Sequence, residues 1–223
     1  MIVLKYHKKD AYTYLSHIDV LRHLTRTIRR ADLTVSFSQG FNPHMLLNMS
    51  VPLPLGHAST AEYVTIQTDM DEKEFLERFN QKAPKGLFGL DAVKTEKNPN
   101  LAGKVLYCDY TIQTEGVSSQ AKEEIEAIPS KSEYVIPYPT RKAPEGEKNV
   151  LPGVLAMWFE GDILNVRAGV GQATVRADIL SQSLAKIFGF TLKGEVCRTK
   201  QYILENGELI DVDIFLKKLR VEK

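Results

Sequence analysis

The stretch SHIDVLRHLTRTIRRADLTVSFSQGFNPH, residues 16–44, decides how the N-terminal part of the chain folds. Ser16, with Asp19 three positions later, forms a variant of the capping box that marks the start of a helix. The acidic side chain is also well placed for the helix dipole. Apolar residues then recur at spacings of three and four, so they share one side of the helix. These residues are Leu21, Leu24 and Ile28.

A polar turn follows the helix at residues 38–44, SQGFNPH. Residues 33–37 alternate in a way that predicts a strand, and residues 46–51 predict a second strand after the turn. Gly40 permits a positive φ, and Asn42-Pro43 is a turn-forming pair. Backbone amides exposed in such a turn can cradle an anion.

The elements around this stretch complete a βαββαβ unit. Residues 2–6 and 63–66 read as strands, and Phe75 and Phe79 lie on the apolar face of a second helix. A strand at residues 87–93 closes the unit. The order strand, helix, strand, strand, helix, strand predicts a ferredoxin-like fold with helices on one face of an antiparallel sheet.

The second half of the chain nearly repeats this order. The predicted strands are 105–112, 134–136, 154–159, 163–168 and 195–204, and the predicted helices are 118–128 and 176–188. We therefore predict an α+β protein of two tandem ferredoxin-like (βαββαβ) domains with antiparallel sheets. The polar residues 95–100 mark the boundary. The predicted limits are 1–96 for the first domain, 103–210 for the second and 211–223 for a C-terminal tail helix.

Charge is unevenly distributed along the 223 residues, whose net formal charge is +1. Residues 1–60 contain seven Lys and Arg residues and three Asp residues, a net charge of +4, so the remainder carries −3. A basic N-terminal part on a nearly neutral chain favours a local anion-binding surface over a general nucleic-acid coat.

The two cysteines, Cys108 and Cys197, are too few for an iron–sulfur cluster or a Cys-rich zinc site, and there is no CxxC motif. Such a cluster therefore cannot be built from this chain, and we expect no cofactor. The sequence shows neither a signal-peptide pattern nor an apolar run long enough for a membrane span. We expect a cytoplasmic protein that does not bind membranes.

The helix and the turn supply the candidate binding residues. Arg22, Arg26 and Arg29 fall nearly opposite the apolar side of the helix, where a solvated face and an anion site are both possible. A phosphate ester would find point charges on the helix and directional donors in the turn. The candidate anion- or RNA-binding residues are Arg22, Arg26, Arg29, Arg30, Ser38, Gln39, Gly40, Phe41, Asn42 and His44.

Three readings of this region stay open at the sequence level. His17, Asp19 and His44 are candidates for general acid–base catalysis. The sequence has neither a His pair at helical spacing nor a Cys/His cluster, so we expect no metal site. His17 and Asp19 are alternatively explained as residues that cap the helix and bond to the turn at residues 39–44. The nearby aromatic residues could stack RNA bases if a sheet displays them, or fill the core. They are Tyr12, Tyr14, Phe37 and Phe41.

The same residues resemble a known family. SHIDVLRHLTRTIRRADLTVSFSQGFNPHMLLNMSVPLPLGHASTAEY is similar to the pattern SHLDLMR…LRRAGLPVAYSQGFNPHP…PLPLG…EY of the bacterial DUF2344 family, also called radical SAM-linked proteins. The resemblance is dense over residues 12–66 and extends to RTKQY at residues 198–202. One departure is that Met45-Leu46-Leu47 follows His44, where the family often has a basic residue.

The resemblance implies a protein encoded beside, or fused to, a B12-binding radical SAM enzyme, which is the expected partner. With the basic helix it suggests a binding module, inactive by itself, that presents RNA or another phosphorylated substrate to that enzyme. An RNA-processing or small-molecule enzyme using His17 or His44 is the first alternative. A protein scaffold without an anion site is the second.

Overall fold

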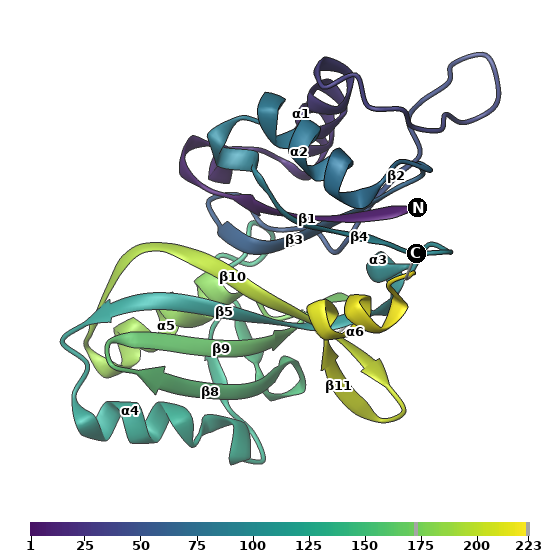
Figure 1. The fold of residues 1–223 in the computed structure, drawn as a ribbon. Helices are drawn as coiled ribbons and strands as arrows, with labels where there is room; N and C mark the ends of the chain where they lie inside the picture. The colour runs from purple at the N-terminus through teal and green to yellow at the C-terminus, as the bar shows by residue number, and fades with distance from the viewer. Residues whose placement is uncertain (172–173, 222–223) are drawn as a thin grey trace. The chain divides into compact units, whose positions relative to one another are not determined.

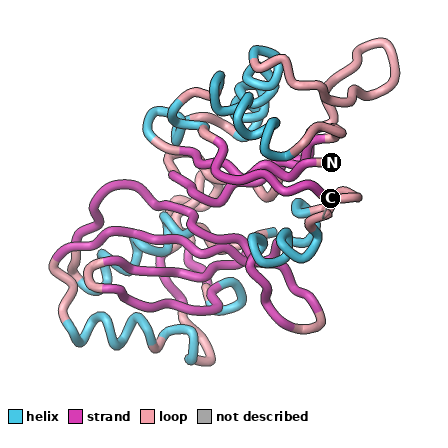
Figure 2. The backbone as a smooth tube through the Cα atoms, viewed as in Figure 1, coloured by secondary structure: helices cyan, strands magenta, loops and turns pink. Residues whose placement is uncertain are grey.

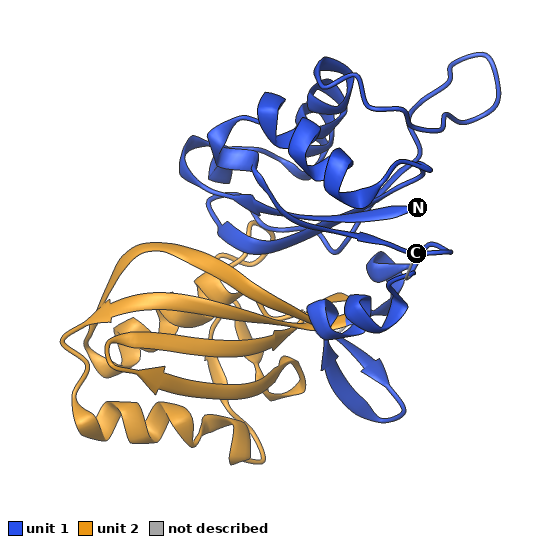
Figure 3. Cartoon of the chain, in the orientation of Figure 1, with its two compact units in different colours: residues 1–105, 202–223 blue, residues 106–201 orange. Residues whose placement is uncertain are grey.

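The computed structural model describes residues 1–171 and 174–221, which form two compact units (Figure 3). Unit 1 comprises residues 1–105 and 202–223, and unit 2 comprises residues 106–201. The fold is α+β, and antiparallel pairing dominates its strands (Figure 1). In this division residues 202–223 belong to unit 1, whereas the sequence analysis placed them in the second domain and the tail. Residues 222 and 223 of the predicted tail lie outside the described residues.

Unit 1 contains a sheet with the strand order β4-β1-β3-β2. β1 pairs with β3 and β4, and β2 pairs with the other edge of β3, all antiparallel. Helices α1 and α2 lie together over this sheet (Figure 1). The elements of unit 1 are β1 (Ile2–Lys8), α1 (His17–Arg30), β2 (Leu47–Met49), β3 (Ala58–Ile66), α2 (Glu72–Lys82), β4 (Gly89–Lys94), α3 (Leu101–Lys104), β11 (Glu208–Asp211) and α6 (Val212–Leu219).

The core of unit 1 fills the space between these two helices and the sheet. It is built from alternate residues of the strands, which share one face of the sheet, and from the apolar sides of the helices. Its fully buried members include Ile2, Leu4, Tyr6, Leu24, Ile28, Val64, Ile66, Phe75 and Phe79. The predicted apolar side of α1 is confirmed at Leu24 and Ile28, with Val20 and Thr27 also buried and Leu21 half-buried.

Helix α6 contacts the opposite face of this sheet. Lys5 and Tyr63 are cross-strand partners, and Lys5 alternates with the core residues of β1, so both point away from the core. Asp213 of α6 accepts hydrogen bonds from Lys5 Nζ at 2.6 Å and from Tyr63 Oη at 2.8 Å. Burial, reinforced by the Asp213 carboxylate, raises the pKa of Tyr63 far above its ordinary value. The sheet of unit 1 therefore has helices on both faces.

Unit 2 contains a sheet with the strand order β10-β5-β9-β8, in which β9 pairs antiparallel with β5 and β8. Its buried core includes Ile112, Leu164, Val166, Leu180 and Leu184. A separate two-stranded ribbon is formed by β6 and β7. The elements are β5 (Val105–Glu115), α4 (Ser119–Glu126), β6 (Val135–Pro137), β7 (Glu147–Asn149), β8 (Val154–Glu160), β9 (Ile163–Gly169), α5 (Ala177–Phe188) and β10 (Thr191–Glu205), of which the last continues into unit 1.

One predicted element is wrong. Residues 33–37 form no strand, because the end of α1 continues into a tight turn with Asp32 at φ 51° and the amide of Leu33 bonded back to the Ile28 carbonyl at 3.2 Å. This turn sends the Leu33 side chain into the core. The segment then contributes an isolated bridge between Phe37 and Met45 in place of a strand. Figure 2 shows a long loop between α1 and β2.

Candidate functional site

The N-terminus of α1 is closed by a reciprocal cap. Ser16 Oγ accepts from the Asp19 amide at 3.2 Å and donates to Asp19 Oδ2 at 2.6 Å. Arg22 Nη1 donates to Asp19 Oδ1 at 2.9 Å. The hydrogen bond from Ser16, then that from Arg22, lowers the pKa of Asp19 below its ordinary range. Both carboxylate oxygens are therefore engaged in holding the helix start, which makes Asp19 a weak base.

The predicted arginine face is present on the exposed side of α1. Two of its four members are engaged with protein groups: Arg22 with Asp19, and Arg30 with the Lys82 carbonyl at 3.2 Å and Thr27 Oγ1 at 3.0 Å. Within residues 1–171 and 174–221, the side chains of Arg26 and Arg29 have no hydrogen bond or ion pair. Two exposed guanidinium groups, one helical turn apart, are thus available to a ligand.

Residues 38–44 form a loop that stands away from unit 1 (Figure 1), and we call it the projecting loop. Its two ends are fastened together by three hydrogen bonds: Ser38 N to His44 O at 2.9 Å, His44 N to Ser38 Oγ at 3.1 Å, and Ser38 Oγ with His44 Nδ1 at 2.9 Å. Met45, immediately after the loop, is buried in the core of unit 1. The loop is therefore closed and anchored at its base.

The tip of the projecting loop is open to solvent. Gly40 adopts φ +119°, a conformation that side chains disfavour, which explains the glycine there. Gln39, Phe41, Asn42 and His44 are exposed, and Phe41 is the most exposed of the large apolar side chains described. The Phe41 ring is therefore open to contact with another molecule.

The remaining predicted aromatic residues do not lie on a sheet face. Tyr12 and Tyr14 belong to a 3-10 helix, Asp10–Tyr14, and Tyr12 packs edge-on against His23 with ring centres 5.5 Å apart. Tyr14 is exposed, and Phe37 lies in the loop beyond α1. A base-stacking sheet built from these residues is therefore excluded, and the projecting loop carries Phe41 as an exposed ring away from any sheet.

The structure divides the predicted site residues into two groups, those on α1 and those on the projecting loop. In the described part of the chain, no hydrogen bond, ion pair or ring contact joins His44 to Asp19, or the projecting loop to the four arginines of α1. His17 lies half-buried in the first turn of α1. The described residues include no cluster of three or more His, Cys, Asp or Glu side chains suited to a metal ion.

Two features of unit 1 were not among the sequence-based predictions. The first is the contact of Asp213 with Lys5 and Tyr63, which joins residues about 150 and 200 positions apart and leaves no local pattern. The second is the β10–β11 hairpin, whose turn contains Asn206 and Gly207 at positive φ. Asn-Gly between apolar segments is the strongest short-range hairpin signal, so this element was readable from the sequence.

The fold and the exposed basic helix define a two-unit α+β protein with a candidate ligand-binding surface on its first unit. A family described as "Uncharacterized protein conserved in bacteria (DUF2344)" matches residues 1–183. The chain therefore belongs to the DUF2344 family, as its SHID and SQGFNPH motifs predicted. No curated protein matches the chain in sequence. In the part of the chain that the structure describes, no helix is both long enough and apolar enough to cross a membrane.

The solved structures that are similar to the chain include the following two. A chain of "Crystal Structure of a Cbf5-Nop10-Gar1 Complex" is 11% identical with a TM-score of 0.44, over 90% of this chain and 48% of that one. This chain thus spans about half the length of that one. "Crystal Structure of an Unknown Protein from Galdieria sulphuraria" is 12% identical with a TM-score of 0.25, over 87% of this chain and 96% of that one. These scores are too low to support an argument about function.

Proposed function

We propose that the chain is a binding module without catalytic activity of its own, which uses α1 and the projecting loop to bind RNA or another phosphorylated substrate. The observation that carries the proposal is the pair Arg26 and Arg29, exposed and without a protein partner. Arginine is well suited to phosphate because its planar donors bind two oxygens at once. In this proposal Phe41 stacks on a base, as aromatic rings do in single-strand binding.

The proposed partner is a B12-binding radical SAM enzyme, to which the module would deliver its ligand. Membership of the DUF2344 family, and the resemblance behind its other name, are what support this partner.

We also propose that both units are ferredoxin-like domains. Each sheet has the spatial order 4-1-3-2 when its four strands are numbered along the chain, with β6 and β7 as an insertion in unit 2.

Binding of unfractionated tRNA, measured by fluorescence anisotropy at several salt concentrations, tests the RNA-binding proposal. Each phosphate contact contributes roughly 0.7 to 0.9 to the slope of log affinity against log salt. Arg26→Glu should weaken binding at least tenfold and reduce this slope by about 1. The fold should be unchanged or slightly stabilised, because Arg26 lies four residues from Arg22 and three from Arg29, and like charges at these spacings repel.

The control is Arg141→Glu, which makes the same charge change at an exposed arginine of unit 2. If both variants reduce affinity equally, the effect is one of net charge and the α1 site is wrong. If the wild-type chain binds no tRNA at low salt, alone or with the radical SAM enzyme, the RNA proposal fails.

A scaffold function is the second candidate, and a separate observation favours it. Tyr14, Ile18 and Leu55 are exposed apolar residues of unit 1. The Gly56 amide donates to the Thr13 carbonyl at 2.9 Å, which brings the backbone of residues 55–56 next to that of residues 13–14. Exposed apolar residues on adjoining segments suit a protein contact. Tyr14→Asp should then abolish co-purification with the radical SAM enzyme while leaving tRNA binding intact; unchanged co-purification rejects this surface.

A further inference from the structure

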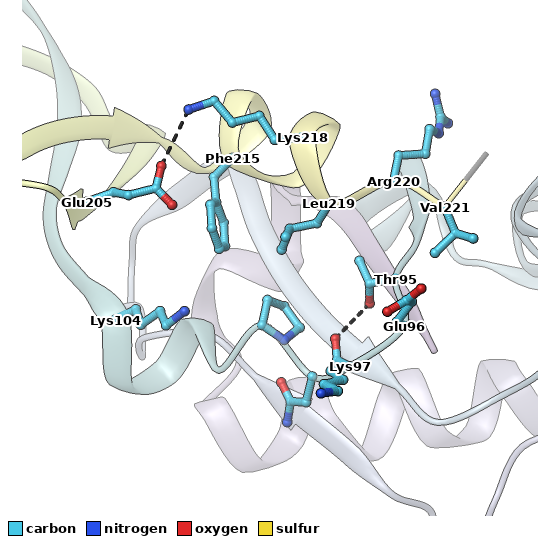
Figure 4. Close-up of a pocket in the computed structure, with 12 residues that line it drawn as sticks. Thr95, Glu96, Lys97, Lys104, Glu205, Phe215, Lys218, Leu219, Arg220 and Val221 are labelled. Carbon is cyan, nitrogen blue, oxygen red and sulfur yellow. Dashed lines mark hydrogen bonds and ion pairs between the residues drawn. The ribbon is translucent and has the colours of Figure 1, made fainter.

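A groove of about 710 Å³ lies in unit 1, between residues 95–99, Lys104 and α6 (Figure 4). This volume is in the range of small-molecule sites, and polar and apolar groups both line it. Phe215 and Leu219 of α6 project toward the middle of the groove. None of the predicted site residues contributes to it, so the groove is distinct from α1 and the projecting loop.

Four basic side chains surround the groove, and two of them are already neutralised. Lys218 Nζ lies 3.4 Å from Glu205 Oε2, and Arg220 Nη2 lies 2.9 Å from Glu72 Oε1. Lys97 and Lys104 have no ion pair within the described residues. Lys104 Nζ is 5.2 Å from the centre of the Phe215 ring, a cation–π contact that leaves its charge uncompensated. The uncompensated charge of Lys104 can pair with a phosphate monoester, which carries about −1.5 to −2 at neutral pH.

The other end of the groove has the opposite character. Glu96 lies away from Lys104, across Phe215 and Leu219 (Figure 4), and its carboxylate has no partner within residues 1–171 and 174–221. A carboxylate there accepts hydrogen bonds from amino or hydroxyl groups. The groove thus offers, in order, a cationic end, an apolar middle and an acceptor end. A simple inorganic anion would use only the first of these.

We infer that this groove binds a nucleoside monophosphate, with the phosphate near Lys104, the nucleoside against the exposed Leu219, and a sugar hydroxyl or base amino group at Glu96. This inference goes beyond the proposed RNA-binding function, because it assigns a separate site and a small free ligand. It requires no chemical step and no further cofactor.

Isothermal titration calorimetry of the full chain with adenosine 5′-monophosphate and uridine 5′-monophosphate tests the inference, with adenosine, uridine and inorganic phosphate as partial ligands. At least one nucleotide should bind ten or more times more tightly than either of its parts. Lys104→Glu should weaken this binding at least tenfold, since it replaces a charge-assisted contact with a repulsion. The control Lys142→Glu makes the same change on an exposed side chain of unit 2 and should have no effect.

Further variants separate this site from the proposed RNA site. Glu96→Gln should alter nucleotide affinity without changing that for inorganic phosphate. Arg26→Glu should leave nucleotide affinity unchanged even where it abolishes tRNA binding, so either proposal can fail without the other. The inference is overturned if neither nucleotide binds, if inorganic phosphate binds as tightly as the nucleotides, or if Lys104→Glu and Lys142→Glu have equal effects.

Discussion

Removing the Asp213 carboxylate should loosen α6 from the sheet of unit 1. This carboxylate accepts hydrogen bonds from Lys5 and from the hydroxyl of Tyr63. Tyr63 is only 1% exposed. A hydrogen bond to a charged group contributes about 1.5 to 3 kcal/mol. The Lys5 pair contributes less, nearer the ~1 kcal/mol of surface pairs, because the side chains of Lys5 and Asp213 are 21% and 39% exposed. Asp213→Ala should therefore lower the free energy of unfolding of unit 1 by about 2 to 4 kcal/mol.

Urea denaturation gives this free energy, and hydrogen exchange of residues 208–219 locates the effect. Asp213→Asn keeps an acceptor for Tyr63 but loses the ion pair, so it should cost about half as much. Asp162→Ala is the control, because its exposed carboxylate lies 3.5 Å from Lys122 and contributes little. The reasoning is refuted if Asp213→Ala is no more destabilising than Asp162→Ala, or if exchange in α6 stays as slow as in the wild type.

Two further predictions concern Tyr63 and Phe41. The pKa of the Tyr63 hydroxyl is raised from its ordinary value of 10. The unfolded chain therefore releases the hydroxyl proton near pH 10, whereas the folded chain keeps it. As a result, the free energy of unfolding falls as pH rises above 10. Tyr63→Phe should remove part of this fall, seen by urea denaturation at pH 9 and pH 11; an equal fall in both proteins contradicts the assignment. Phe41→Ala should change the free energy of unfolding by no more than about 0.5 kcal/mol, because the ring is fully exposed. In anisotropy titrations it should weaken tRNA binding by about 1 to 3 kcal/mol without changing the salt slope. Unchanged affinity would rule out base stacking by this ring.

Local sequence signals determined several elements of unit 1. The helix start at Ser16 and Asp19 was predictable because a cap is a contact between residues three apart. The apolar side of α1 at Leu24 and Ile28, and with it the exposed arginines, follows from helical periodicity alone. The SHID and SQGFNPH motifs likewise sufficed to predict the family that residues 1–183 match.

Tertiary structure decided the remaining features. Residues 33–37 have an alternating pattern, yet a turn at Asp32 turns Leu33 into the core, so packing overrode the strand pattern. The closure of the projecting loop by Ser38 and His44, the coverage of the sheet by α6 and the groove beside Phe215 all depend on side chains brought together by folding. Periodicity reports which residues of one element share a face. It does not report which distant element will cover that face, because that choice depends on shape and charge in three dimensions.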